Sequence, residues 1–191
     1  REGDLILHPR LPDVRKLYIQ PTTGCNLHCR TCIRNVWDEH EAQMPMNTFH
    51  RLVESLDRLP HLTRVVFSGF GEPLTHPNIL EMIGAVRKRN IAVTLGSNGL
   101  LLEIEMAREL VRLGVDRLVV SVDGVKPETY ASVRGAMLSQ VLSNIRGLNE
   151  VKRQLGSLTP ALGIEFVVLK TNATELAELR GLASQLNAAR V

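Results

Sequence analysis

The sequence has little of several features that define other classes of protein. Aromatic residues make up only 4% of its 191 residues, which disfavours a base-stacking platform for single-stranded nucleic acid. No apolar run approaches the roughly 18 residues that a membrane-spanning helix needs, and the first residues carry no hydrophobic signal segment. The net charge is only +3, with acidic and basic residues interleaved. We therefore expect neither a nucleic-acid nor a membrane partner.

Cysteine is also scarce, and all of it lies in one short loop, at Cys25, Cys29 and Cys32. Secreted disulfide scaffolds usually carry an even number of cysteines spread through the chain, so a reducing, cytoplasmic setting is expected. Thiolates are soft ligands that select zinc, copper(I) or iron–sulfur clusters. Structural metal sites normally close their shell with a fourth protein ligand, whereas catalytic sites keep one position open. The missing fourth cysteine predicts an inorganic centre with an open position.

A histidine near the loop supplies an alternative to that interpretation. His28 lies between two of the cysteines and His40 follows the loop, so either imidazole could complete a zinc site of three thiolates and one nitrogen. The protein would then be a zinc-binding interaction module.

Short apolar runs rich in β-branched residues alternate with longer amphipathic segments along the chain. Strands are predicted at residues 16–20, 64–68, 91–95, 117–122 and 163–169. Helices are predicted from residues 47 and 77 onward and over residues 103–113, 127–133, 138–151 and 174–186. Strands that are apolar on both faces and separated by helices indicate a parallel sheet with crossover helices outside it. The pattern predicts an α/β fold, either a β/α barrel or a doubly wound open sheet.

Small, polar and acidic residues follow successive predicted strands. In β/α barrels the active site lies at the carboxyl ends of the strands. The cysteine loop follows the first strand, Gly-Phe-Gly-Glu-Pro (69–73) the second and Ser-Asn-Gly (97–99) the third, while Ser-Val-Asp-Gly (121–124) ends the fourth. Each segment alone is typical of an ordinary turn. Their placement at successive strand ends predicts one site on a single rim.

The cysteine loop, with three and then two residues between its thiols, and the Gly-Phe-Gly-Glu-Pro turn after the second strand resemble the radical S-adenosylmethionine superfamily. The resemblance covers about residues 16–174, in the family's order. It implies a partial, TIM-like β/α barrel, a four-iron four-sulfur cluster held by the three cysteines, and S-adenosylmethionine on the open iron. Reductive cleavage of S-adenosylmethionine would then give a 5′-deoxyadenosyl radical that abstracts hydrogen from a substrate.

The resemblance also implies residues for the methionine end of S-adenosylmethionine. The turn with Gly69, Gly71 and Glu72 would bind the methionine ammonium. Ser121 and Arg134 would lie at the carboxylate, which a guanidinium can bind through two hydrogen bonds.

Further contacts are implied for the rest of the nucleoside. Ser97, Asn98 and Asp123 would reach the ribose or the methionine end, and the backbone around Val167 and Val168 would meet the adenine. Many family members place an aromatic residue directly before the third cysteine, where this chain has Thr31. Packing on the adenine is therefore expected from elsewhere, such as Ile33 or Trp37.

Within the family, the run from Cys29 to Asp38 and the turn after the second strand most resemble maturases of tungsten-cofactor oxidoreductases. The wider group of cofactor- and peptide-maturing enzymes, related to molybdenum-cofactor biosynthesis or carrying SPASM-type domains, is the broader expectation. The resemblance implies a small-molecule precursor or a peptide as substrate and ferredoxin or flavodoxin as electron donor.

Five β/α units are present where the family's core commonly has six, and the first residue is not Met. Residues 1–191 are therefore expected to form a core domain truncated before its sixth strand. A non-catalytic remnant of the barrel is a further alternative, beside the zinc module.

Overall fold

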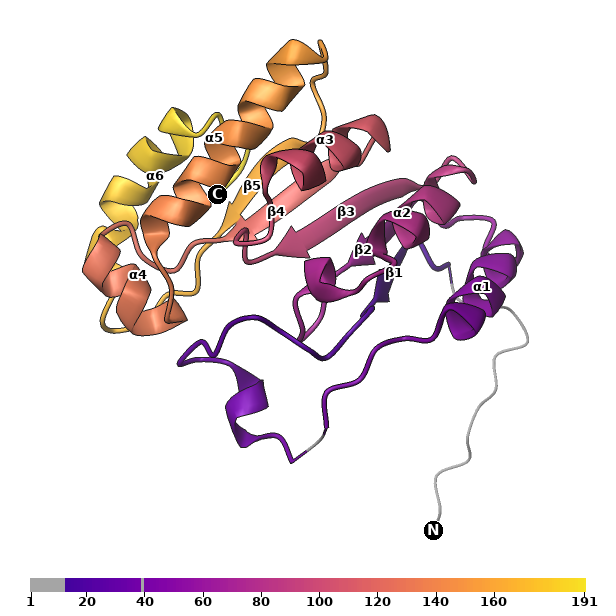
Figure 1. The fold of residues 1–191 in the computed structure, drawn as a ribbon, viewed down its shortest axis with the longest axis horizontal. Helices are drawn as coiled ribbons and strands as arrows, with labels where there is room; N and C mark the ends of the chain where they lie inside the picture. Colours follow the sequence, from indigo (N-terminus) through magenta and orange to yellow (C-terminus); the bar gives the residue numbers. More distant parts are fainter. Residues whose placement is uncertain (1–12, 39) are drawn as a thin grey trace.

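The computed structural model describes residues 13–38 and 40–191, in which five strands form one parallel sheet. The strands are β1 (Lys16–Ile19), β2 (Arg64–Phe67), β3 (Ala92–Ser97), β4 (Arg117–Ser121) and β5 (Ala161–Glu165). Each strand pairs with the next along the chain, in the order β1-β2-β3-β4-β5 (Figure 1). A doubly wound sheet would reverse its strand order at a switch point. The unreversed order is that of a partial barrel, which confirms the first of the two predicted architectures.

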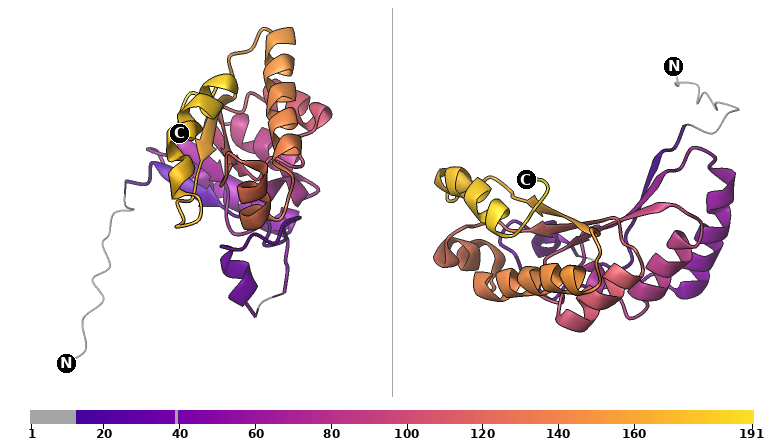
Figure 2. Two further views of the ribbon diagram at one scale, coloured as in Figure 1. Left: turned by 90° about the vertical axis from the view of Figure 1, so that its left-hand side faces the viewer. Right: turned by 90° about the horizontal axis from the view of Figure 1, so that it is seen from above.

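Six α-helices connect and follow the strands in the described residues. They are α1 (Met46–Ser55), α2 (Ile79–Arg87), α3 (Ile104–Arg112), α4 (Pro127–Arg134), α5 (Leu138–Gln154) and α6 (Leu176–Gln185). The sheet is curved, and helices α1, α2, α3 and α5 lie along its convex side (Figure 2). None of the helices in the described ranges is long and apolar enough to cross a membrane.

The hydrophobic core lies between the convex face of the sheet and these helices. One row of the core crosses all five strands in register and consists of Ile19, Phe67, Leu95, Leu118 and Leu162. Every side chain in this row is at most 2% exposed. Burying an apolar side chain of this size contributes about 1.5–3 kcal/mol relative to leaving it in water. This row anchors the strands whose carboxyl ends carry the predicted site.

The opposite, concave face of the sheet carries apolar side chains such as Val66 and Ile164 but also polar and charged ones, so the prediction of strands apolar on both faces holds only in part. Lys16, Arg64, Thr94 and Arg117 alternate with the core positions and line a hollow on this face. In a partial barrel the helices cover only the outside, and the inner face becomes the wall of a lumen. The concave side chains therefore need not be apolar.

The fifth strand is shorter than predicted, ending at Glu165 and not at residue 169. Beyond it, side chains replace strand neighbours as hydrogen-bond partners of the backbone. Val167 donates its N–H to Asp123 at 2.8 Å and accepts from the amide of Asn172 at 2.9 Å, and Leu169 donates its N–H to Asn172 at 2.6 Å. The chain then returns beside β5, where Arg190 forms an isolated parallel bridge with Gly163 at the place expected for a sixth strand.

Candidate active site

A cavity of about 290 Å³ lies at the carboxyl ends of the strands. Ten of the residues predicted to bind the cluster or S-adenosylmethionine line it: Cys25, Cys29, Cys32, Gly69, Gly71, Glu72, Ser97, Asn98, Ser121 and Arg134. They come from the cysteine loop, from the turn after β2, from the end of β3 and the turn after it, from the end of β4 and from α4. The structure thus brings together on one rim residues that are more than a hundred positions apart in the sequence.

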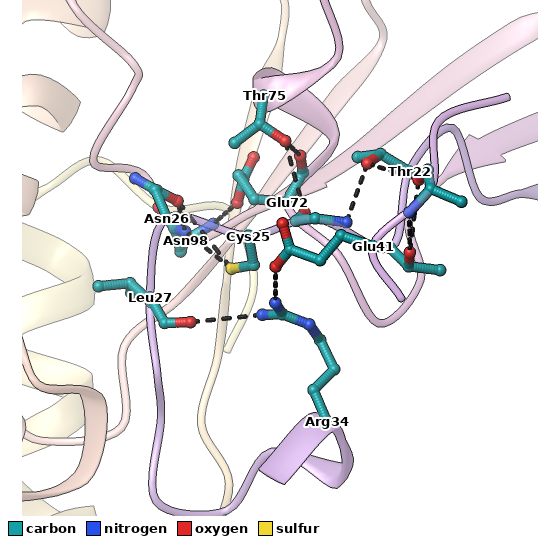
Figure 3. A network of polar contacts seen from close by, with 12 residues as sticks. Thr22, Cys25, Asn26, Leu27, Arg34, Glu41, Glu72, Thr75 and Asn98 are labelled. Atoms are coloured by element: carbon teal, nitrogen blue, oxygen red, sulfur yellow. Dashed lines mark hydrogen bonds and ion pairs between the residues drawn. The ribbon is translucent and has the colours of Figure 1, made fainter. Parts of the chain in front are cut away.

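The cysteine loop is held by its own polar contacts. Asn35 donates its side-chain amide to the carbonyl of Cys29 at 2.9 Å, and the N–H of Cys32 donates to the same carbonyl at 3.0 Å. Arg34 donates to the carbonyl of Leu27 at 3.4 Å and forms an ion pair with Glu41 (Figure 3). All three cysteines are free and partly buried. The loop therefore presents its thiols from a fixed backbone.

The turn after β2 packs directly against this loop. The N–H of Glu72 donates to the carbonyl of Gly24 at 2.9 Å, and Thr75 donates its hydroxyl to the same oxygen at 3.4 Å. A Cβ on Gly71 would collide with the carbonyl oxygen of Thr22 and lie 2.6 Å from that of Gly24. Only glycine at position 71 allows this approach, which keeps the Glu72 turn and the thiols at one cavity wall.

Glu72 is a buried carboxylate, only 2% exposed, at this wall. One of its oxygens accepts the N–H of Leu74 at 3.0 Å and the other accepts the N–H of Asn98 at 2.6 Å (Figure 3). Burial raises the pKa of Glu72, and these hydrogen bonds only partly oppose the shift. Within residues 13–38 and 40–191 it forms no ion pair. A buried carboxylate with two backbone donors and no cation fits a positively charged ligand group such as an ammonium.

Asn98, from the turn after β3, ties this turn to the cysteine loop. Its amide donates to the side-chain oxygen of Asn26 at 2.7 Å and lies 3.9 Å from the sulfur of Cys25 (Figure 3). Burial raises the pKa of the Cys25 thiol and that of the Cys29 thiol, and the charge of Arg134 opposes the shift at Cys29. Loading with metal would therefore release protons from these thiols.

Arg134, at the end of α4, supplies the cation of the site. Its side chain is 11% exposed, and it donates to Asp123 at 2.9 Å. Its Nε is buried and has no hydrogen-bond partner in the described part of the chain. A guanidinium that lines a cavity and keeps an unused donor fits a carboxylate ligand, because such pairs form through two parallel hydrogen bonds.

Two of the predicted cofactor contacts, Asp123 and Val167, do not line the cavity. Asp123 is fully buried behind Arg134, with one oxygen on the guanidinium and the other on the N–H of Val167. The N–H of Val167 thus already donates a hydrogen bond to Asp123, and the side chain of Val167 is 43% exposed. In the structure these two residues hold Arg134 and the segment after β5 together.

The two side chains expected to pack on the adenine, Ile33 and Trp37, both lie outside the cavity lining. Thr31 and Phe70 line the cavity, whereas Ile33 and Trp37 do not. The ring of Trp37 packs edge-on against that of Phe70, with centroids 4.6 Å apart. Phe70, from the glycine-rich turn after β2, is therefore the aromatic side chain that lines the cavity.

Sequence reasoning missed several residues that build the cavity. Ser68, Gly96 and Glu165 line it, and Asn26 and Asn172 support it through hydrogen bonds. Glu165 had a usable signal, since it is the first charged residue after an apolar run and ends a strand. The two asparagines lie in loops and had none.

The zinc alternative finds no support in this geometry. No three Cys, His, Asp or Glu side chains in the described ranges are grouped to hold a single metal ion. His28 is exposed. A lone zinc ion needs all its sulfur ligands within about 2.3 Å of one point, whereas a four-iron cluster spreads its ligands over several metal ions. The partly buried thiols at one cavity wall fit the cluster better.

Comparison with known proteins agrees with this geometry. The model of the Radical SAM superfamily matches residues 19–179. A tungsten-containing aldehyde ferredoxin oxidoreductase cofactor-modifying protein of Pyrococcus furiosus is 34% identical over 167 residues, which is 87% of this chain and 47% of that protein. A probable GTP 3′,8-cyclase of Methanocaldococcus jannaschii is 27% identical, covering 92% of this chain and 57% of its own length. The chain spans about half the length of the curated relatives it matches.

Solved structures share the fold. The crystal structure of Streptococcus suis SuiB bound to S-adenosylmethionine matches with a TM-score of 0.75 at 19% identity, over 91% of this chain and 38% of that one. HydG, a maturase of the [FeFe]-hydrogenase, matches with a TM-score of 0.66 at 17% identity, over 90% and 38%. The superfamily uses a four-iron four-sulfur cluster and S-adenosylmethionine, the cofactors that the thiols, Glu72 and Arg134 fit. The chain belongs to the radical S-adenosylmethionine superfamily.

Proposed function

We propose that this chain is the catalytic core of a radical S-adenosylmethionine maturase that abstracts hydrogen from a cofactor precursor or a peptide. One observation carries the proposal: a single cavity joins three free thiols, a carboxylate that forms no ion pair among the described residues, and a guanidinium whose Nε has no hydrogen-bond partner there. These are the groups needed to hold a cluster and both charged ends of a methionine. The similarity to the cofactor-modifying protein of Pyrococcus furiosus supports the maturase class.

Cys25, Cys29 and Cys32 would hold the cluster and leave one iron without a protein ligand. When bound, the cluster and S-adenosylmethionine supply the electron and the 5′-deoxyadenosyl group that abstracts hydrogen. Arg134 would bind the methionine carboxylate through the guanidinium donors that face the cavity, while Glu72 would accept from the ammonium.

The remaining cavity residues would shape the site around the methionine and the nucleoside. Ser121, at the end of β4, would donate to the carboxylate beside Arg134, and Ser97 would contact the methionine or the ribose. Gly69 and Gly71 line the cavity, and their lack of a side chain lets the turn pack against Gln20 and the backbone of Thr22 and Gly24. The adenine would pack near Phe70 and meet the backbone carbonyl of Val167, which accepts one hydrogen bond from Asn172.

Asp123 acts as a positioning residue for Arg134 in this proposal, because it is buried and accepts from the guanidinium. The electron would come from a donor such as ferredoxin or flavodoxin, in the cytoplasm.

The test is anaerobic reconstitution with iron and sulfide, followed by reduction in the presence of S-adenosylmethionine. We expect a brown protein that releases 5′-deoxyadenosine, and a Cys29→Ala variant that does not. His28→Ala is the matched control, because His28 is an exposed neighbour in the same loop and should leave product formation unchanged. A colourless protein with stoichiometric zinc, or a loaded cluster that yields no product, would contradict the proposal.

A further inference from the structure

The concave face of the sheet carries a second hollow, of about 500 Å³, below the cofactor cavity. Three basic side chains line it at the amino ends of the strands: Lys16 from β1, Arg64 from β2 and Arg117 from β4. We call these three residues the basic row. Helices α1, α2, α3 and α5 lie along the convex side and not on this face (Figure 2).

The strand register places Lys16 and Arg64 on neighbouring strands, whereas Arg117 lies on β4, beyond β3. Lys16 is the register partner of Arg64, on strands roughly 4.8 Å apart. Arg64 donates to the hydroxyl of Thr94 at 2.9 Å, and Thr94 is the register partner of Arg117. Three positive charges therefore line one hollow, and Thr94 of the intervening strand β3 lies between Arg64 and Arg117.

Nothing in the described ranges neutralises these charges. None of the basic row forms an ion pair with a carboxylate of residues 13–38 or 40–191. The acidic residue that lines the hollow, Glu165, lies at its other end, four register positions beyond Arg117, or roughly 13 Å along the strands. Like charges side by side on a sheet face cost stability. Folding alone does not account for this arrangement, whereas binding of an anion does.

The hollow is continuous with the cofactor cavity. Ser68, Gly96 and Glu165 line both. A Cβ on Gly96 would lie 2.8 Å from the hydroxyl oxygen of Ser68, so glycine keeps this junction open. A ligand seated on the basic row can therefore reach the cavity where hydrogen abstraction would take place.

We propose that the basic row binds an anionic group, a phosphate or a carboxylate, of an elongated substrate whose reacting carbon lies at the cofactor cavity. The inference rests on the proposed function and names its substrate class: a small molecule whose anionic group lies roughly 13 Å from its reacting end. The two guanidinium groups suit either anion, because each can donate two parallel hydrogen bonds to paired oxygens.

The test is titration calorimetry at low ionic strength on the reconstituted protein, with inorganic pyrophosphate in one arm and citrate in the other. We expect at least one of the two anions to bind. The anion with the lower dissociation constant shows whether the basic row prefers phosphate or carboxylate. Arg64→Gln and Arg117→Gln should each weaken that binding about tenfold or more, as expected for loss of a charge-assisted contact. Arg64→Lys, which keeps the charge, should lose less. Arg180→Gln is the matched control, because it removes one exposed positive charge from α6.

Two results would overturn the inference. One is that neither pyrophosphate nor citrate binds, and the other is that Arg64→Gln and Arg117→Gln weaken binding no more than Arg180→Gln does. The same samples are also assayed for 5′-deoxyadenosine formation without substrate. This assay tests the proposed function independently of anion binding. Product without anion binding refutes only the basic row, and anion binding without product refutes only the proposed catalysis. Thermal melts of each variant show whether a loss of binding reflects unfolding.

Discussion

Gly71 offers a sharp test of how the turn after β2 is joined to the cysteine loop. An alanine at this position would place its Cβ into the carbonyl oxygen of Thr22 and 2.6 Å from that of Gly24. Both obstacles are backbone atoms, so no side-chain rotation relieves the clash. The turn and the loop must move apart, which also breaks the hydrogen bond from the Glu72 N–H to the Gly24 carbonyl.

The expected cost follows from these two effects. Inserting a methyl group where the surroundings cannot relax costs about 1–3 kcal/mol, and a lost backbone hydrogen bond costs about 1 kcal/mol. We therefore expect Gly71→Ala to lower the free energy of unfolding by about 2–4 kcal/mol, which is a large share of the total for a domain of this size. We also expect reduced iron content after reconstitution, because the loop that carries the thiols is displaced.

Denaturant unfolding and iron determination measure the two effects, and Gly181→Ala is the control. Gly181 lies within α6, where an added Cβ meets nothing within 4 Å. Alanine there should stabilise the protein by about 0.5–1 kcal/mol, because glycine is a poor helix former. If Gly71→Ala matches the parent protein in stability and iron content, the close packing of turn against loop is refuted.

Two further predictions concern residues behind the cavity. Asp123→Asn should raise the KM for S-adenosylmethionine about tenfold in 5′-deoxyadenosine formation, because Arg134 loses its charged partner. The asparagine oxygen can still accept the N–H of Val167, so that contact is kept. An unchanged KM would argue against a positioning role for Asp123. Glu175 is buried, which opposes its ionisation, but hydrogen bonds from Thr129 and from the N–H groups of Val125 and Lys126 outweigh burial and lower its pKa. Its folded pKa lies below the unfolded value of about 4.3, so its contribution to stability is present above that pH and is lost as the pH falls through the folded pKa. Glu175→Gln should therefore flatten this acid-induced loss in denaturant titrations, and equal acid sensitivity of the two proteins would contradict the assignment.

Local patterns in the sequence were sufficient to predict the helices and strands and the edge of the sheet that carries the candidate site. Gly114 directly follows the helix predicted over residues 103–113 and has the left-handed φ of +69° that glycine supplies at helix ends. Pro127 was predicted to open a helix, and it is the first residue of α4. The cavity residues were found because parallel strands bring their carboxyl ends to one edge, so strand ends alone locate the site.

The remaining features depend on contacts between distant parts of the chain. The early end of β5 follows from Asp123, which takes the N–H of Val167 from 44 positions away. The burial of Asp123 behind Arg134 follows from the packing of α4, which no periodicity encodes. The basic row looked like ordinary first residues of strands, because its grouping depends on how neighbouring strands align.

The central claim is that three thiolates hold a cluster whose open position S-adenosylmethionine completes. The most direct measurement is the electron paramagnetic resonance spectrum of the reconstituted, reduced protein before and after addition of S-adenosylmethionine. We predict a cluster signal that changes in shape and g-values when S-adenosylmethionine binds. A cluster signal that stays the same at saturating S-adenosylmethionine would contradict the claim.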